Sequence, residues 1–343
     1  MKLINEALTY DDVLLVPQYS DIESRKEVSI DNSLSEDILL NLPIISAPMD
    51  TVTGHEMAIA MSTMGGLGII HRYNSIAAQK KEVERAFDQG ISVVGAAVGV
   101  TEDFEQRACV LFDAGAKVIC IDVAHGHHLL VERAIKTLKD IFGDKAHIMA
   151  GNIATPEGYK TLANWGADSI RCNVGGGSIC STRIQTGHGM PGLQTIIDCA
   201  KHKRSKTKII ADGGIRNSGD MVKALAAGAD FVMIGSLLAG TDQSPGELIY
   251  NKSGTRDKVY RGMASKEAQF DWRGKYSSNE GISTTIPHKG NAKNVLESLK
   301  NGIKSGLSYS GCRNIIELQE NALFVRQTSS GLAESHTHIL GIR

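Results

Sequence analysis

Apolar residues gather in short runs along the chain, and these runs alternate with longer segments in which apolar positions recur every three or four residues. The short runs are rich in valine and isoleucine, which is typical of buried strands. The longer segments have the period of amphipathic helices, and several end in a glycine (Gly115, Gly166, Gly228), the residue that a left-handed helix end favours. The predicted strands span 43–49, 67–71, 92–99, 118–124, 147–154, 169–175, 208–214 and 231–236.

Eight strand–helix units in series predict a parallel sheet closed into a (β/α)8 barrel, an α/β fold that takes up the whole chain, 1–343, as one domain. The alternative is an open, doubly wound sheet. A dinucleotide-binding sheet of that kind would carry G-x-G-x-x-G after its first strand. No predicted strand is followed by this pattern, which favours the barrel.

Composition narrows the class of protein. The 343 residues are 42% hydrophobic and include 37 basic and 38 acidic side chains, for a formal net charge of −1. No basic stripe supports nucleic-acid binding, and no run approaches the roughly 20 apolar residues of a membrane span. The first residues, 1–12, lack the apolar core of a signal peptide. The six cysteines form no C-x-x-C pair, so we expect reduced thiols in a cytoplasmic protein.

Glycine, small polar residues and acids are concentrated where the predicted strands end, as in ADGGI at 211–215 and IGSLLAG at 234–240. In a barrel these ends meet at one face, which carries the active site. The last two ends follow strands seven and eight, where main-chain amides commonly bind a phosphate. We therefore predict a phosphate site there; simple tight turns are the alternative explanation for the glycines.

The loop GGGSICSTR, at 175–183, places Cys180 among glycines and small polar residues. A free cysteine is most often a small buried hydrophobic residue. This loop offers little apolar cover, and its amides can stabilise a thiolate, so we expect Cys180 to be a nucleophile. Four other cysteines fall within helix or strand patterns and are expected to pack in the interior: Cys109, Cys120, Cys172 and Cys199.

The histidine-rich stretch HGHH, at 125–128, suggests a metal site at first sight. Its histidines are adjacent, whereas a helical zinc pair has histidines four residues apart. We therefore do not expect a metal ion there.

A set of motifs, in order along nearly the whole chain, resembles the family of IMP dehydrogenases and GMP reductases, purine-nucleotide barrels with a cysteine nucleophile. The matching segments are LTYDDVLLVP at 8–17, ISAPMDTVT at 45–53, GAAVG at 95–99, AGN at 150–152, GGGSICSTR at 175–183, IADGGI at 210–215, GADFVMIGSLLAG at 228–240, YRGMAS at 260–265 and SGLSYSG at 305–311. The resemblance implies a purine mononucleotide substrate, a nicotinamide cofactor and a homotetramer.

The resemblance also implies roles for individual residues. Cys180 would attack C2 of the purine, with Thr182 and Glu280 handling the proton of the leaving ammonia. Asp212 would hold the ribose, Met263 and Ala264 the base, and a third group the phosphate: Ser178, Gly214, Gly235, Ser236 and Tyr260. The remaining substrate positions are Ser46, Met49, Gly213 and Gly262.

The cofactor positions implied by the resemblance are Asp122, Val123, Ala124, Asn152 and Gly175. The backbone carbonyls of Gly175, Gly177 and Cys180 match those that bind potassium in IMP dehydrogenases. One departure is visible, because Gly176 stands where the family usually has the proline of GPGS.

Two features favour a GMP reductase over an IMP dehydrogenase. Only DQGI, at 88–91, joins the second barrel helix to the third strand, where dehydrogenases usually carry regulatory CBS modules. The mobile segment at about 264–290, here called the flap, has only sixteen residues between Met263 and Glu280. Its Arg273 and Tyr276 are not adjacent, so the Arg-Tyr pair with which dehydrogenases hydrolyse their adduct is missing. A C-terminal segment, 291–343, follows the flap.

Other features point the opposite way. GAAVG at 95–99 and the tail SGLAESHTH at 330–338 are more like a dehydrogenase. Glu280 also matches a glutamate in dehydrogenases, and C-x-T, here Cys180 and Thr182, occurs in both enzymes. Arg72 stands where both relatives often show lysine, so it favours neither. The expectation is an NADPH-dependent GMP reductase that forms IMP and ammonia; the alternative is an IMP dehydrogenase without CBS modules that uses NAD. A nucleotide-sensing barrel without turnover is a third interpretation, which the intact Cys180 disfavours.

Overall fold

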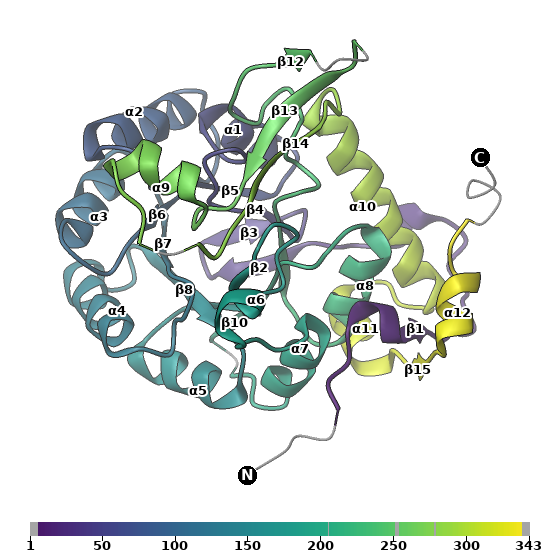
Figure 1. Cartoon of the computed structure of the whole chain (residues 1–343). Helices are drawn as coiled ribbons and strands as arrows, with labels where there is room; N and C mark the ends of the chain where they lie inside the picture. Colours follow the sequence, from purple (N-terminus) through teal and green to yellow (C-terminus); the bar gives the residue numbers. More distant parts are fainter. Residues whose placement is uncertain (1–5, 205, 251–253, 278, 338–343) are drawn as a thin grey trace.

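Eight parallel strands close into a barrel in the order β10-β11-β4-β5-β6-β7-β8-β9 (Figure 1). The computed structural model describes residues 6–204, 206–250, 254–277 and 279–337. The barrel strands are β4 (Ile44–Ser46), β5 (Leu67–Ile70), β6 (Gly95–Val98), β7 (Val118–Asp122), β8 (His147–Ile153), β9 (Ser169–Cys172), β10 (Lys208–Asp212) and β11 (Phe231–Ile234). Each lies within a predicted run, so the predicted barrel is confirmed.

Helices surround the barrel and bury their apolar faces against it (Figure 1). Gly115, Gly166 and Gly228 have φ values of 111°, 106° and 111° at the ends of three of them, which confirms the predicted left-handed helix ends. The helices around the barrel are α1 (His55–Thr63), α2 (Ile76–Phe87), α3 (Phe104–Asp113), α4 (Leu129–Phe142), α5 (Pro156–Trp165), α7 (Gly192–Ala200), α8 (Ser218–Ala226) and α10 (Ala292–Tyr309).

The barrel interior is a packed apolar core. It includes Leu67, Met149 and Phe231, all fully buried. The hairpin of β2 (Asn32–Ser35) and β3 (Ile38–Leu40) contributes Leu34 and Leu40 to the same cluster. Since this hairpin directly precedes β4, it closes the end of the barrel where the strands begin and leaves the opposite end open for the site.

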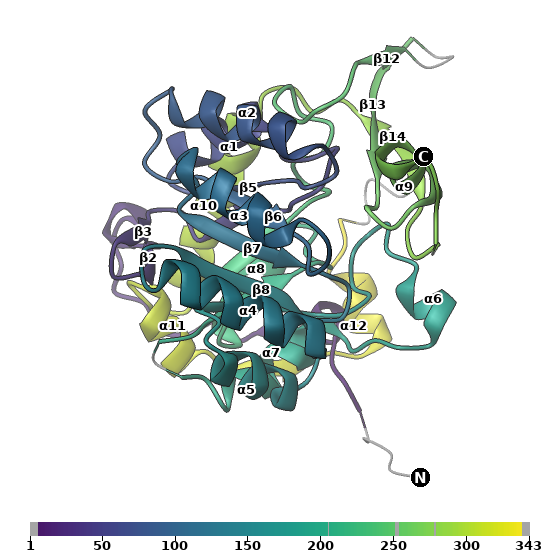
Figure 2. The same cartoon turned by 90° about the vertical axis from the view of Figure 1, so that its left-hand side faces the viewer.

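The opposite end is covered by additions to the barrel. A small antiparallel sheet of β12 (Ile249–Tyr250), β13 (Arg256–Arg261) and β14 (Ser283–Pro287) carries α9 (Lys266–Arg273) between its last two strands. Figure 2 shows this sheet, α9 and α6 (Thr182–Thr186) on the same side of the barrel. The flap therefore contains α9 and β14, and β14 pairs with β13, which precedes the flap.

A segment near the start of the chain pairs with one near its end on the outer wall. A 3-10 turn at Tyr10–Asp12 leads into β1 (Val13–Leu15), which pairs antiparallel with β15 (Phe324–Arg326). The remaining elements are a second 3-10 turn at Arg25–Glu27 and the helices α11 (Ile315–Asn321) and α12 (Ser329–Glu334).

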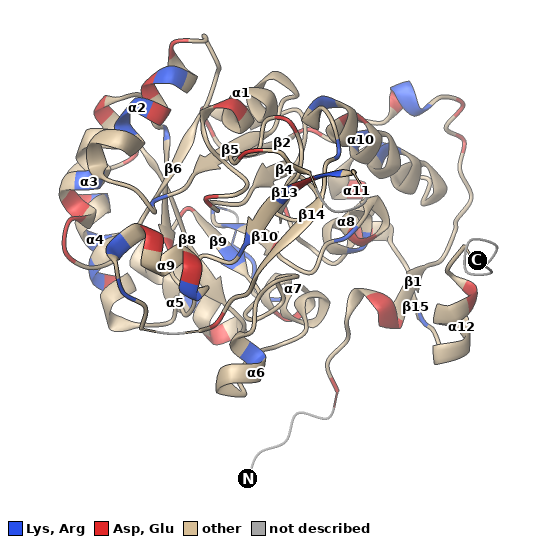
Figure 3. Ribbon diagram, turned by 45° about the horizontal axis from the view of Figure 1, so that its top comes forward, with Lys and Arg blue, Asp and Glu red and all other residues tan. Residues whose placement is uncertain are grey.

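Charged residues of both signs are interspersed over the outer helices, and Figure 3 shows no stripe of one sign across α2 to α5. This distribution agrees with the formal net charge of −1. Among the described residues, no helix combines the length and apolar character needed to cross a membrane.

Candidate active site

The residue predicted to be the nucleophile lies on the loop between β9 and α6, at the open end of the barrel. Cys180 is half-buried, and its Sγ lies 3.1 Å from Oγ1 of Thr182, toward which the thiol donates. Thr182 is the first residue of α6 and is 8% exposed. The structure thus brings together two of the three predicted catalytic residues by a direct side-chain contact.

Glu280, the third, is brought to this loop by backbone pairing. The Ser181 amide donates to the Glu280 carbonyl at 3.0 Å, and Cys180 pairs antiparallel with Gly281. The Ile282 amide donates to the Ile179 carbonyl, also at 3.0 Å. The flap therefore continues as a strand beside the loop of Cys180 and fixes Glu280 next to it in register.

Three of the predicted phosphate residues, Ser178, Gly235 and Ser236, lie around the hydroxyl of a fourth, Tyr260. Tyr260 Oη lies 3.1 Å from Ser178 Oγ, and burial raises its pKa, while hydrogen bonds to Ser178 and Ser236 act in the opposite direction. A Cβ added to Gly235 would lie 3.4 Å from the same hydroxyl oxygen, and one added to Gly214 would lie 3.3 Å from the Gly176 carbonyl oxygen. Loops after β9, β10 and β11 and strand β13 thus meet around a small polar cradle.

Asp212, the predicted ribose carboxylate, belongs to a network around the buried Arg171, which the sequence pattern did not predict. Arg171, on β9, donates from Nη1 to Asp122 Oδ1 at 2.5 Å, and its Nη2 lies 2.9 Å from Asp212 Oδ2. Asn152 Nδ2 donates to the same Asp212 oxygen at 2.7 Å. Burial by itself would lower the pKa of Arg171, but Asp212 and Asp122 outweigh it and raise that pKa above the ordinary value.

Two of these network residues, Asp122 and Asn152, are predicted cofactor positions. Val123 is half-buried and Ala124 exposed at the rim. Nearby, Arg72 donates to the Asp122 carbonyl at 3.2 Å. Its buried Nε lies 3.8 Å from Asp122 Oδ2, beyond hydrogen-bond distance, and has no hydrogen-bond partner among the described residues. A buried donor without a partner is costly, so this side of the site fits a ligand that carries polar groups.

The flap helix docks on the same side. The Trp272 ring stacks on Tyr73 with centroids 4.2 Å apart and planes inclined by 14°. The Arg72 guanidinium lies 5.3 and 5.4 Å from the centroids of the Tyr73 and Trp272 rings. Tyr73 follows β5, so this contact joins α9 to the loop after the second barrel strand.

The predicted base-binding segment is attached to the first barrel strand. Asp50 donates its amide to Met263 Sδ at 3.3 Å, and its carboxylate accepts from Arg261 at 2.7 Å. Arg261 also donates to Asp271 of α9 at 2.5 Å. Arg261 thus joins the loop after β4, which carries Met49, to the flap, and holds Met263 and Ala264 between them.

Two predicted substrate positions have no open surface. Ser46 is fully buried and lies 2.9 Å from the hydroxyl of Thr53. Gly262 is buried, and a Cβ there would lie 3.2 Å from Gly281 Cα. Their side chains, or the lack of one at Gly262, support the packing beneath the site.

The remaining histidines and cysteines singled out in the sequence differ in burial. His125 is exposed; burial lowers its pKa, as do His127, His128 and His188. Among the described residues, no three histidine, cysteine, aspartate or glutamate side chains are arranged to hold a metal ion. Cys120, Cys172 and Cys199 are buried as predicted, whereas Cys109 is only half-buried.

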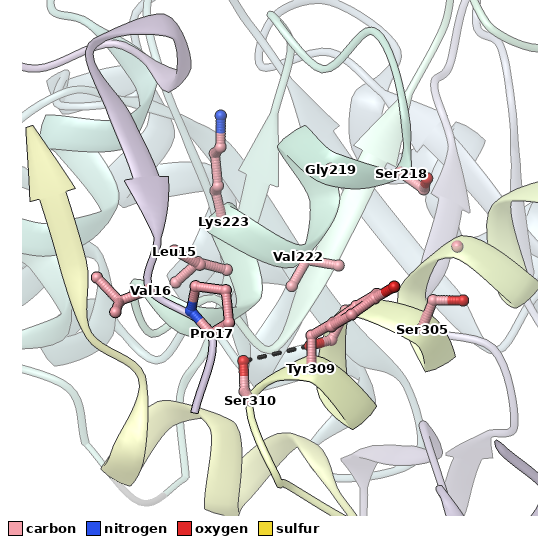
Figure 4. Close-up of a pocket in the computed structure, with 12 residues that line it drawn as sticks. Leu15, Val16, Pro17, Ser218, Gly219, Val222, Lys223, Ser305, Tyr309 and Ser310 are labelled. Carbon is pink, nitrogen blue, oxygen red and sulfur yellow. Dashed lines mark hydrogen bonds between the residues drawn. The ribbon is translucent and has the colours of Figure 1, made fainter. Parts of the chain in front are cut away.

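A cavity of about 360 Å³ lies on the outer wall between β1, α8 and α10 (Figure 4). Pro17, Val222 and Tyr309 line it, and none of the predicted site residues does. It is separate from the loop of Cys180.

Comparison with known proteins supports the family resemblance that the sequence motifs indicate. Residues 7–338 match the family model described as IMP dehydrogenase / GMP reductase domain. The chain belongs to the IMP dehydrogenase and GMP reductase family. It is therefore an oxidoreductase of a family that uses a nicotinamide cofactor.

Relatives of both kinds are similar to the chain. It is 39% identical to the inosine-5'-monophosphate dehydrogenase of Cryptosporidium parvum (98% of this chain, 96% of the relative) and 34% identical to that of Nitrosopumilus maritimus (97% and 98%). A solved structure of a GMP reductase variant from Trypanosoma brucei, in complex with guanosine 5'-monophosphate, matches with a TM-score of 0.92 and 31% identity over 98% of each chain.

Proposed function

We propose that the protein is a GMP reductase, which converts GMP to IMP and ammonia with NADPH through a covalent adduct at Cys180. The observation that supports this proposal most is that Arg273 and Tyr276 make their contacts within the flap. Arg273 donates to Gln269 Oε1 at 3.0 Å and lies 5.0 Å from the Trp272 ring centroid, while Lys266 lies 5.3 Å from the ring of Tyr276. Both candidates for a dehydrogenase's Arg-Tyr pair are thus engaged in contacts within the flap.

Glu280, by contrast, is paired by its backbone to the loop of Cys180. A glutamate in that place can exchange a proton with a leaving amine. The similarity to a GMP reductase solved with guanosine 5'-monophosphate supports the same substrate.

The residues would act in two steps. The Cys180 thiolate adds to C2 of GMP, and the C2–N bond breaks as Glu280 and Thr182 deliver the proton with which ammonia leaves. This leaves C2 bonded to sulfur. After reduction at C2, the carbon–sulfur bond breaks and Cys180 departs as a thiolate, releasing IMP. When bound, the nicotinamide cofactor supplies the hydride for that reduction.

The rest of the site would bind and orient. Ser178, Ser236 and Tyr260 donate to the phosphate, and Asp212 accepts from the ribose hydroxyls with the oxygen that Arg171 and Asn152 leave free. Asp122, Asn152 and the Arg72 Nε, which makes no hydrogen bond to the described residues, would face the cofactor.

Potassium and the tetramer remain predictions. The carbonyls of Gly175, Gly177 and Cys180 all belong to the glycine-rich loop, and that of Gly177 already accepts the Cys180 amide at 3.1 Å, which leaves it one lone pair for an ion. Turnover measured with and without potassium chloride tests the first, and light scattering tests the second.

IMP dehydrogenase is the second candidate, with NAD as the cofactor. The relatives with 34 and 39% identity, all bearing that name, favour it. Absorbance at 340 nm decides between the two candidates. With GMP and NADPH we expect a decline, and with IMP and NAD no change; the opposite result would establish the dehydrogenase.

A further inference from the structure

Asn173, directly after β9, has a backbone conformation that side chains rarely adopt. Its φ is 139°, and the residue is 4% exposed. Non-glycine residues at such φ values cost free energy and persist only where their surroundings hold them. The residue begins the loop that leads to Cys180, so its side chain merits an explanation.

The Asn173 amide links three segments. Its Nδ2 donates to the Gly213 carbonyl at 3.2 Å, on the loop that follows Asp212, and its Oδ1 accepts from Arg183 Nη2 at 3.4 Å, on α6. Arg183 in turn donates to the carbonyls of Val174 at 3.2 Å and Met190 at 2.5 Å. The two segments on either side of Cys180, at 174 and 190, are thereby tied to each other and to Asn173.

The same amide fills the space above Gly176. A Cβ at position 176 would lie 2.0 Å from Asn173 Nδ2 and 2.7 Å from its Cγ and Oδ1. No side chain, and no proline ring, fits there while Asn173 keeps this position. The glycine in GGGS is thus the steric counterpart of the asparagine three residues earlier.

We propose that Asn173 is a positioning residue for the loop that carries Cys180, and that Gly176 is required because the Asn173 amide occupies the volume above it. A proline at 176 would restrict the chain covalently; here hydrogen bonds from Asn173 and Arg183 restrict it instead. The inference rests on the proposed nucleophilic role of Cys180, but not on the direction of the reaction.

A double-mutant cycle tests this proposal on the full chain. The variants are Gly176→Ala, Asn173→Gly and the two combined, with Asn173→Asp as the variant that keeps the size but loses the donor to Gly213. Two quantities are measured: kcat with its KM for the nucleotide, and the alkylation rate of Cys180 by iodoacetamide as a function of pH, mapped by peptide mass spectrometry.

We expect Gly176→Ala alone to lower kcat and the alkylation rate by about tenfold or more, because the methyl group displaces Asn173. In the Asn173→Gly background the same change should cost less than about threefold, since the space is then open. Asn173→Asp should lower kcat while leaving KM nearly unchanged. Thermal unfolding of each variant shows whether it folds.

Equal losses from Gly176→Ala in both backgrounds would overturn the proposal. If none of the proteins, wild type included, turns over GMP or IMP, the proposed function fails. The alkylation rates still complete the cycle in that case, so the two failures are distinguishable.

Discussion

Arg171 holds Asp212 from two of its nitrogens, with Nε 3.0 Å and Nη2 2.9 Å from the same carboxylate oxygen. Its third nitrogen, Nη1, contacts Asp122. One buried cation thus fixes both the carboxylate proposed for the ribose and the carboxylate proposed for the cofactor, so the two ligand sites share a support.

Replacing Arg171 with methionine should therefore damage both sites together. Two largely buried carboxylates would lose this cation, with only Arg72 left 3.8 Å from Asp122, and breaking a fully buried pair costs about 3–5 kcal/mol of folding free energy, which is an upper bound here. We expect KM to rise for nucleotide and cofactor alike, with Arg171→Lys intermediate because lysine lacks the planar fork. Steady-state kinetics and thermal unfolding measure both effects.

Arg326 provides the control, because its pair with Glu6 is exposed (63% and 57%). Arg326→Met should cost less than about 1 kcal/mol. If Arg171→Met raised KM for only one of the two ligands, Arg171 would not support both binding sites.

Cys180→Ala should abolish turnover and leave nucleotide binding largely intact. The thiol would form the covalent bond, whereas the phosphate would bind to Ser178, Ser236 and Tyr260, which do not depend on that thiol. We expect kcat to fall by several powers of ten. A variant that keeps more than about a tenth of the wild-type kcat would exclude the nucleophilic role. Calorimetric titration with GMP measures the binding. Cys109→Ser, on α3, serves as the matched thiol control, and an active Cys180→Ala enzyme would disprove the nucleophile.

Trp272 should control how firmly the flap helix docks. Its stack on Tyr73 joins α9 to the barrel, and an aromatic pair contributes about 0.5–1.5 kcal/mol beyond its buried area. Trp272→Ala should lower kcat/KM by roughly twofold to tenfold, while Trp272→Phe, which can still stack, should lose less. The chain has two tryptophans, so in a Trp165→Phe background the fluorescence of Trp272 reports docking directly. Identical kinetics for the alanine and phenylalanine variants would contradict this role.

The barrel could be predicted from sequence because each strand is a compact apolar run with its own turn signal. Cys180 and the glycines after β10 and β11 could be found because bare, polar strand ends are a local feature. Arg171 could have been noticed, since a charged residue in the middle of a buried strand must have partners. Its two partners on β7 and β10, however, are visible only once the barrel closes.

The flap contacts were beyond prediction for a different reason. Trp272 meets Tyr73, and Arg261 meets Asp50, across most of the length of the chain. Neither pair has a periodicity or a spacing that joins its members. Asn173 and Gly176 are close in sequence, but the position of the Asn173 amide above the glycine depends on the backbone conformation at Asn173, which the sequence pattern does not indicate.

His147 should make the protein sensitive to mild acid. Burial lowers its pKa from 6.5 to about 3, and its ring lies 2.8 Å from Ser169 Oγ. The unfolded chain takes up a proton as the pH falls below 6.5, whereas the folded protein does so only near pH 3. Stability should therefore fall between these values, by at most about 5 kcal/mol at roughly 1.4 kcal/mol per pH unit.

Thermal unfolding from pH 7 to pH 4 tests this expectation. In His147→Asn the slope with pH should flatten, because asparagine takes up no proton. His202→Asn, at an exposed position, should leave the slope as it is. An unchanged slope in His147→Asn would show that other groups cause the acid sensitivity.

Variants of Glu280 and Arg273 test the proposed direction of the reaction. If the protein is a reductase, Glu280 exchanges a proton with the leaving amine, and water is never activated. Glu280→Gln keeps the size of the side chain but not its proton exchange, so GMP reduction should slow by about 10²–10⁴-fold, the usual range for a general acid–base group. Arg273→Ala should change the rate of GMP reduction little, because that arginine contacts Gln269 and Trp272 within the flap.

The measurement is NADPH oxidation at 340 nm together with ammonia release. In a dehydrogenase the larger loss of activity would come from Arg273→Ala, which would destroy NAD-dependent formation of XMP from IMP. None of the variants would then reduce GMP.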